Sequence, residues 1–374
     1  MRRRFFNKIG GGDLLAGNFI VFDKSVSNPA NITISKDSEF LNSLINDGFY
    51  RVLCKSAMGG KEVFICRLKP DNSNLYYDGS SAVLTGQGGD VMVVFPEFWY
   101  KWYKVDDNRF LYHFADHDID GTYIHVSKSL VGAYKGYAAG SANRKLYSWS
   151  DVMPSVTISL NNFIAYAINR GNGYQIIDFK QHCVIAMMLY AKYKTRNLQG
   201  VLGYGAAASD TIPTTGSSNA TGNADTKNEN SKYVCGLGLE GVFGGINEWV
   251  KGVEVNNRVW KITDPDGSTR NVNACDKSGW ITNVAAENGP FFDMVPTGTS
   301  NVSSNYYSDY YYQSSRNSLI LARSFFGSGS NGGVAFTDVD NVASGTYAYY
   351  GSRLAFRGII TEVDVDTFKK LPAL

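Results

Sequence analysis

The sequence has no excess of charge of either sign, and this argues against a nucleic-acid partner. Its 36 Lys and Arg residues nearly balance 34 Asp and Glu residues, and charged residues make up only 19% of the 374 residues. Proteins that bind a phosphate backbone draw much of their affinity from clustered basic side chains. We therefore expect no nucleic-acid partner.

Long hydrophobic runs are also missing. Residues 1–22 are basic and then mildly apolar, but Asn7, Lys8 and Asp13 interrupt them before a signal-peptide core or a membrane span could form. We expect no signal peptide and no membrane span, so export would need another route, such as virion assembly in the cytoplasm. The hydrophobic content of 44% is nevertheless enough to bury a substantial core.

Cysteines with the spacing of metal ligands are absent. The five cysteines lie far apart, without a C-x-x-C pair or a short Cys/His run, and we expect buried free thiols. Three His and three Asp residues between Tyr112 and His125 could bind a metal ion, but the rest of a calcium-binding loop is missing. We interpret this run as a solvated turn and expect no metal and no cofactor.

The remaining pattern is typical of an α+β domain. Over residues 48–374, apolar β-rich runs alternate with Gly, Asn and Asp turns. Helical spacing predicts one helix over Ser159–Asn169 and another over Asp178–Lys194, whose first residue could cap it. Residues 206–231 are almost all small or polar, which predicts an exposed insertion loop.

The N-terminal part looks like a separate piece. Residues 1–47 contain a Gly-rich start and two short β-like runs, and they are too few to bury much on their own. We interpret them as an attachment or oligomerisation segment in front of the main domain.

Two motifs resemble those of a known superfamily. The run GLEGVFGGINEWVKGVEV at Gly238–Val255 and the run YYGSRLAFRG at Tyr349–Gly358 resemble signatures of the C-type-lectin-like superfamily, which includes formylglycine-generating enzymes and phage variable proteins. The first run does not keep the full N-x-x-E-W spacing, and the second has Ser352 in place of the Phe of a G-F-R-L strand. Three further runs match a subgroup of phage tail and prophage proteins in the same order: 90–103, 145–179 and 308–313.

The resemblance implies a fold and a set of structural residues. The implied fold is C-type-lectin-like, of the formylglycine-generating-enzyme variant, with two helices, many short strands, long loops and a short β-rich N-terminal segment. Its scaffold motif would comprise Glu248, Trp249, Gly351 and Arg353. We expect Trp249 and Arg353 to be buried, and Glu248 to be a buried or half-buried carboxylate that accepts backbone hydrogen bonds.

Catalytic residues of that superfamily are not found. The copper-binding cysteines of formylglycine-generating enzymes lie in the C-terminal part of the domain, and no cysteine follows Cys275 here. The resemblance therefore implies a protein that is not an enzyme. Two alternatives remain open: a glycan-active or oxidising enzyme that uses carboxylates such as Asp116 and Asp118, and a purely structural virion protein.

The C-terminal part has the composition of a binding surface. Eight tyrosines lie between Tyr306 and Tyr350 among many Ser, Gly and Asn residues, a mixture that is typical of paratopes. From Ser314 to Arg357 there is no Lys, Glu, Gln, Met or Trp. These are the five residues that codons with two randomised bases and a third pyrimidine cannot encode. The resemblance implies such a mechanism, a diversity-generating retroelement acting on residues 314–357.

Carried over position by position, the resemblance divides this region into two sets. Residues 318–322, 332–334, 341–343 and 351–356 would be fixed. The ligand-binding, variable set would be Arg323, Phe325, Phe326, Ser328, Phe336, Asp338, Asp340, Thr346, Tyr347, Tyr349 and Tyr350. We expect the aromatic residues at 325, 326, 336, 347 and 349 to share one exposed face.

The implied role is host recognition by a phage tail fibre. The partner would be a protein or polysaccharide receptor on a bacterial surface, and the chain would sit on a virion tail or on a bacterial cell surface. A tail fibre would make a homotrimer the expected assembly.

Overall fold

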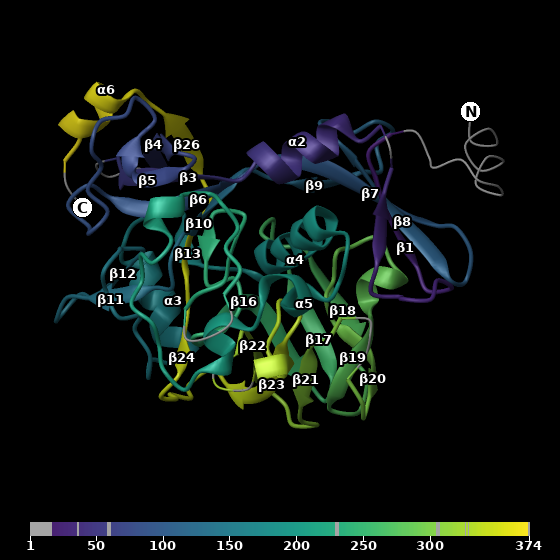
Figure 1. Cartoon of the computed structure of the whole chain (residues 1–374). Helices are drawn as coiled ribbons and strands as arrows, with labels where there is room; N and C mark the ends of the chain where they lie inside the picture. Colours follow the sequence, from purple (N-terminus) through teal and green to yellow (C-terminus); the bar gives the residue numbers. More distant parts are fainter. Residues whose placement is uncertain are drawn as a thin grey trace.

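The computed structural model describes residues 17–372 except 36, 58–60, 229–231, 304–306, 326 and 328. Strands account for 38% of it and helices for 17%, arranged in five sheets that include a curled half-barrel. This is the predicted α+β class. In Figure 1, α2 (Glu39–Asp47) lies across the top, α4 (Phe179–Tyr193) and α5 (Leu198–Leu202) lie below it, and a nine-stranded sheet forms the lower side.

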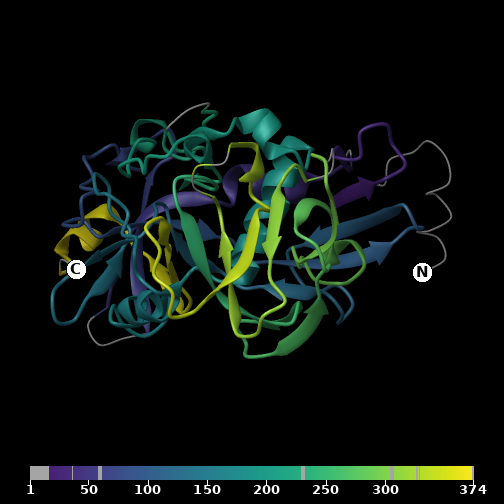
Figure 2. The same cartoon turned by 90° about the horizontal axis from the view of Figure 1, so that it is seen from below.

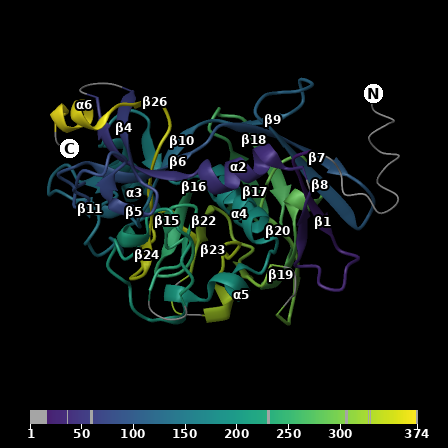
Figure 3. The same cartoon turned by 45° about the horizontal axis from the view of Figure 1, so that its top comes forward.

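The first sheet has five strands in the order β2-β1-β8-β7-β9. Its strands are β1 (Phe19–Asp23), β2 (Ile32–Ile34), β7 (Phe98–Lys104), β8 (Arg109–Ala115) and β9 (Ile124–Val126). Ile20 and Phe22 of β1 and Leu41 of α2 belong to the main core cluster. Figure 3 shows α2 in front of α4, with which it is in contact. The described residues up to 47 therefore pack into the same core as the rest, and their role in attachment stays a prediction.

The second sheet has eight strands in the order β13-β25-β10-β6-β3-β4-β26, with β5 beside β4. Its central strand β6 is buried at every position, as expected for a continuous apolar run. The strands are β3 (Tyr50–Ser56), β4 (Glu62–Lys69), β5 (Asn72–Tyr76), β6 (Asp90–Phe95), β10 (Ser129–Gly132), β13 (Tyr174–Ile176), β25 (Leu354–Phe356) and β26 (Ile359–Glu362). The C-terminal helix α6 (Val365–Lys370) contacts β4.

The largest sheet has nine strands in the order β18-β17-β16-β22-β23-β21-β19-β20, with β24 beside β16. They are β16 (Asn247–Asn256), β17 (Val259–Thr263), β18 (Thr269–Asn273), β19 (Gly279–Val284), β20 (Pro296–Ser300), β21 (Tyr310–Gln313), β22 (Leu319–Arg323), β23 (Thr337–Val342) and β24 (Tyr350–Gly351). One face of this sheet packs on the main core, in which Trp260, Tyr311 and Leu321 are buried. We call the opposite face the outer face.

Both helices predicted from the sequence are present, but the described residues also form α2, α5 and α6, which were not predicted. The helix α3 (Leu160–Ile168) begins after Ser159, whose side chain accepts a hydrogen bond from the Asn162 N–H. Asp178 caps α4 in a reciprocal capping box with Gln181. The predicted ends are therefore right to within one residue, because the caps are local features of the sequence.

The segment 206–231 is less exposed than predicted. It lies between α5 and β14 (Cys235–Gly236), which pairs with β15 (Leu239–Glu240) in one of two small sheets; the other small sheet pairs β11 (Tyr137–Ala139) with β12 (Lys145–Tyr147). Thr215, Ser218 and Asn219 are buried. The Glu240 carboxylate accepts hydrogen bonds from the backbone N–H groups of Gly216 and Ser218, both at 2.9 Å. Polar residues can be buried here because their partners are supplied by the body of the protein.

The cysteine prediction is confirmed for four of the five thiols. All five cysteines are free, and all are buried except Cys275, which is half-buried. No helix in the described part of the chain is long and apolar enough to cross a membrane.

Candidate functional site

The candidate site lies on the outer face of the nine-stranded sheet, where strand alternation turns aromatic side chains away from the core. In β21, Tyr311 points into the main core, and Tyr310 and Tyr312 on either side of it are half-buried on the outer face. Trp280 of β19 pairs in register with Tyr310 and is also half-buried. Figure 2 brings the yellow-green strands of this region to the front.

Four rings follow one another across this face, and we call Trp280, Tyr310, Tyr312 and Phe325 the aromatic row. Ring centroids are 5.7 Å apart for Trp280 and Tyr310, 4.5 Å for Tyr310 and Tyr312, and 6.0 Å for Tyr312 and Phe325. All four side chains are half-buried. The row is continuous because each ring packs on the next.

The prediction that Phe336 is exposed is wrong. Its side chain is 0% exposed, because the rings of Phe325 and Tyr312 lie over it with centroids at 4.3 and 5.9 Å. It forms the floor of the aromatic row. Phe326 and Ser328, which were predicted to be variable and outward-facing, lie outside the described residues.

Asp338 links the aromatic row to a second group of tyrosines. Its backbone pairs with Tyr312 in parallel register, so its side chain shares the outer face. The carboxylate accepts hydrogen bonds from the Tyr350 hydroxyl, the Asp340 N–H at 3.0 Å and the Asn341 amide at 3.2 Å. Burial raises the pKa of Asp338, although these hydrogen bonds oppose the rise.

Asp338 and Tyr350 were predicted to be variable and to face outward, but both are buried. Asp338 is 8% exposed and Tyr350 4% exposed, and this corrects the prediction for both. The Tyr350 ring packs on the indole of Trp249, with centroids 4.5 Å apart, while its hydroxyl is held by Asp338. A buried tyrosine needs such a partner for its hydroxyl.

The neighbouring residues 346–350 form what we call the tyrosine loop. Thr346 and Tyr349 are exposed, and Tyr347 is half-buried against Tyr350. Asp340 is exposed and forms an ion pair with Arg316 at 2.6 Å. These residues agree with the predicted outward-facing set.

Trp249 and Arg353 are buried as predicted. The Trp249 indole N–H donates a hydrogen bond to the Ile158 carbonyl at 3.0 Å. Gly351 is required by close packing, because a Cβ there would lie 2.6 Å from Cδ1 of Ile246 and 2.7 Å from the Ser155 carbonyl oxygen. Part of the outer face is thus closed off by a second core cluster that includes Trp249, Tyr350 and residues of α3.

Glu248 is the centre of a buried ion cluster, which we define as Lys135, His182, Glu248 and Arg353. Glu248 lies 2.9 Å from Nε of Arg353, 3.0 Å from Nζ of Lys135 and 3.5 Å from Nε2 of His182. Burial by itself would raise the pKa of Glu248, but Arg353 and Lys135 hold it at about 2. The prediction of a buried carboxylate is right, whereas its partners are cationic side chains and not backbone groups.

Arg353 also joins the end of β10 in the second sheet to the end of β15 in a small two-stranded sheet. Its Nη1 donates to the carbonyls of Gly132 and Ala133, and its Nη2 donates to those of Glu240 and Gly241, at 2.9–3.1 Å. The guanidinium therefore has a partner on every nitrogen, which a buried charge needs.

Arg323 is a structural residue and not part of the exposed face. It is 2% exposed, and its guanidinium donates to the carbonyls of Ala335, Phe336 and Met294 at 2.8, 3.2 and 2.7 Å. The prediction that it belongs to the ligand-binding face is wrong, because the side chain turns inward to hold the loop before β23.

The same loop is held from the other side by Asp309. Its carboxylate accepts a hydrogen bond from the Ala335 N–H at 2.8 Å, and a Cβ on Gly333 would lie 1.9 Å from its Oδ1. Burial raises the pKa of Asp309 to about 7, although backbone hydrogen bonds from Ala335 and Gly333 lower it. Glycine at 333 is thus needed for the close approach of this carboxyl group.

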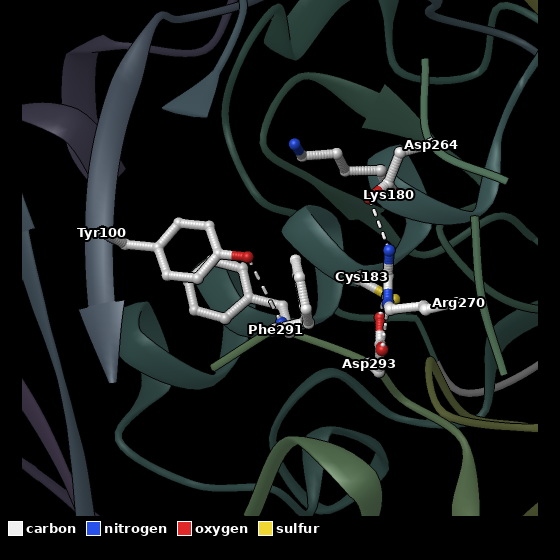
Figure 4. A pocket seen from close by; sticks show the side chains of 8 residues that line it. Tyr100, Lys180, Cys183, Asp264, Arg270, Phe291 and Asp293 are labelled. Carbon is white, nitrogen blue, oxygen red and sulfur yellow. Dashed lines mark hydrogen bonds and ion pairs between the residues drawn. The ribbon is translucent and has the colours of Figure 1, made fainter. Parts of the chain in front are cut away.

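Two cavities lie elsewhere. One of about 10 Å³ has room for about a single water molecule. In Figure 4, Arg270 lies there between the carboxylates of Asp264 and Asp293. The other is a groove of about 500 Å³ beside β26, lined partly by Arg67 and Glu362.

The carboxylates considered for an enzyme lie in an exposed turn. Asp116 pairs with His117 at 2.6 Å, and Asp118 accepts the Gly121 N–H at 2.9 Å. Neither lines either cavity. Within the described residues, no group of three or more His, Cys, Asp or Glu side chains could hold a metal ion.

The sequence interpretation missed most of the aromatic row. Tyr310 and Tyr312 could have been found from the alternation in the run SDYYYQ, because residues two apart share a face of a strand. Trp280 gave no local signal, since its neighbour Tyr310 lies 30 residues away in the sequence and only strand pairing brings them together. In comparisons with known proteins, no family model matches the chain, and no curated protein matches it.

Proposed function

We propose that this chain is a non-enzymatic receptor-binding protein with a C-type-lectin-like fold of the formylglycine-generating-enzyme variant. Its outer face binds a receptor on a bacterial surface, and the chain is carried on a phage or prophage tail fibre or on a cell surface. Recognition, without chemistry, is the mechanism.

One observation carries the proposal: residues 314–357 combine buried segments with outward side chains, although Ser318 and Val342, which were predicted to be fixed, are exposed. The strand Leu319–Arg323 and residues 351–356 are buried throughout. Phe325, Asp340 and Tyr349 are half-buried or exposed, and they flank Asp338 on the outer face. A framework of this kind can keep its shape while the outward residues change, as diversification requires.

The exposed residues also have suitable chemistry. Tyrosine supplies a large, rigid contact surface at low entropic cost, and the polar neighbours supply hydrogen bonds. Individual sites of this size bind modestly, and several copies on one virion would raise the overall affinity through avidity.

Cell binding tests the proposal directly. Purified protein is labelled and added to a panel of bacterial strains, and binding is measured by flow cytometry. A triple variant, Asp340→Asn, Thr346→Asn and Tyr349→Ser, should lose binding to any strain that the unaltered protein binds. A matched triple on other exposed surfaces, Val26→Ser, Tyr77→Ser and Ile119→Asn, should keep it.

Both variants must retain the melting temperature of the unaltered protein for the comparison to count. Equal binding by both triple variants would contradict the assignment of the site. Absence of binding to every strain would favour the alternative of a structural virion protein.

A further inference from the structure

We propose that the aromatic row binds an uncharged polysaccharide whose sugar rings pack along Trp280, Tyr310, Tyr312 and Phe325, against ring faces or ring edges, since neighbouring rings are inclined by 79°, 41° and 30°. This inference rests on the proposed function and extends it, because it adds residues outside the diversified segment and names the chemical class of the receptor.

The first argument is geometric. The four rings come from β19, β21 and the loop after β22, and each centroid lies 4.5–6.0 Å from the next. The ladder between β19 and β21 sets the first step of the row, and the buried Phe336 supports its far end at Phe325. A preorganised row of this kind loses little entropy when a chain of sugar rings lies along it.

The second argument is the nature of the exposed surface. An aromatic ring presents a negative face, and the C–H groups of a sugar ring carry partial positive charge, so the two pack face to face. The tyrosine hydroxyls in the row can both donate and accept hydrogen bonds from sugar hydroxyls. The Asn331 amide lies 3.5 Å from the Tyr312 hydroxyl and adds a further polar group at the same edge.

The third argument is charge. The row itself contains no charged side chain, and two carboxylates on the outer face, those of Asp338 and Asp340, are already engaged. Asp338 accepts three hydrogen bonds, and Asp340 pairs with Arg316. Protein interfaces usually combine aromatic anchors with Arg at the core of the interface, and the Arg on this face, Arg316, lies outside the row in an exposed ion pair with Asp340. A partner that offers hydroxyls and no charge fits this surface better.

The experiment uses soluble uncharged polysaccharides as probes: dextran, yeast mannan, laminarin and starch. Binding is measured by affinity gel electrophoresis of the full chain, and tryptophan fluorescence is recorded in parallel. Trp280→Ala and Tyr312→Ala should each weaken binding by roughly tenfold, which corresponds to the loss of one stacked ring. Trp280→Phe and Tyr312→Phe should retain most of the affinity, and the control Tyr77→Ala should retain all of it.

Cells that bind the protein provide a second arm. Periodate, which cleaves sugar diols, should abolish binding to those cells, whereas protease treatment should leave it unchanged. The receptor is a protein if protease abolishes binding, periodate does not, and the row variants bind normally. That result overturns the polysaccharide inference, while the proposed function stands.

Two further results would overturn the inference. One is that no probe polysaccharide binds and periodate leaves cell binding intact. The other is that the unaltered protein is an oligomer that Trp280→Ala dissociates, since the row would then be an interface between copies. If no strain binds but a probe polysaccharide binds through the row, the inference stands and the proposed cell-surface receptor fails.

Discussion

The ion cluster and the aromatic row both include residues of the nine-stranded sheet, but their side chains are held in different ways. In the ion cluster, four ionisable side chains are buried, and Arg353 alone donates to four carbonyls as well as to Glu248. In the aromatic row, four rings are half-buried and hold one another mainly by contact. A network of paired charges tolerates few changes, whereas stacked rings at a surface tolerate many.

This difference predicts where the domain should tolerate substitution. The charged side chains define the positions of loops that are distant in the sequence, because each unpaired buried charge would be costly. The outward side chains are in contact with solvent, so replacing one of them leaves no buried charge without a partner. Changes in stability should therefore be large at the ion cluster and small at the tyrosine loop.

The largest effect is expected at Arg353. Arg353→Ala removes the main partner of Glu248 and leaves a buried carboxylate next to Lys135, so the free energy of unfolding should fall by about 3–5 kcal/mol. Urea denaturation measures the loss. A variant that unfolds at the same urea concentration as the unaltered protein would contradict the view that the ion cluster holds the loops together.

A similar but mainly apolar effect is expected at Trp249, which also donates one hydrogen bond to the Ile158 carbonyl. Trp249→Ala should cost about 3–5 kcal/mol through the cavity it leaves beside Tyr350, and Trp249→Phe should cost less. Differential scanning calorimetry compares the two variants. If Trp249→Ala were no worse than an exposed substitution such as Tyr77→Ala, the second core would not support the tyrosine loop.

The free energy of unfolding should depend moderately on pH, and Asp309 should account for part of that dependence. Because its pKa is raised to about 7, the folded state holds a proton that the unfolded chain releases at its ordinary pKa of about 4. Stability from this group is therefore greatest at low pH, falls as the pH rises between those values, and is level above about 7.

The variant Asp309→Asn isolates this contribution. Since it cannot ionise, its free energy of unfolding should change less than that of the unaltered protein between pH 5 and pH 8, as measured by chemical denaturation. Glu62→Gln, at a half-buried position on β4, serves as a control for the general effect of removing a carboxylate. An unchanged pH profile in Asp309→Asn would show that the group is ionised throughout.

The smallest effect is expected at the tyrosine loop. Thr346→Asn and Tyr349→Ser change exposed side chains, so each should alter the free energy of unfolding by no more than about 0.5 kcal/mol. Thermal denaturation followed by circular dichroism measures both. A loss as large as that at Arg353 would remove the contrast between the ion cluster and the outward side chains of the tyrosine loop, and residue 349 would then be part of the core.

The sequence by itself determined the features that depend on neighbouring residues. Both helices were located to within one residue, because apolar spacing and the caps at Ser159 and Asp178 are encoded over three or four positions. The burial of Trp249 followed from its large apolar surface.

Only the tertiary structure decided which aromatic and charged residues reach the surface. Phe336 and Arg323 lie in a segment of paratope-like composition, but the rings of Phe325 and Tyr312 cover the first, and loop carbonyls bind the second. Trp280 lies beside Tyr310 because β19 pairs with β21, and no local sequence pattern predicts that pairing. Exposure depends on which distant segment packs on a side chain, and long-range packing is information that a local sequence pattern does not carry.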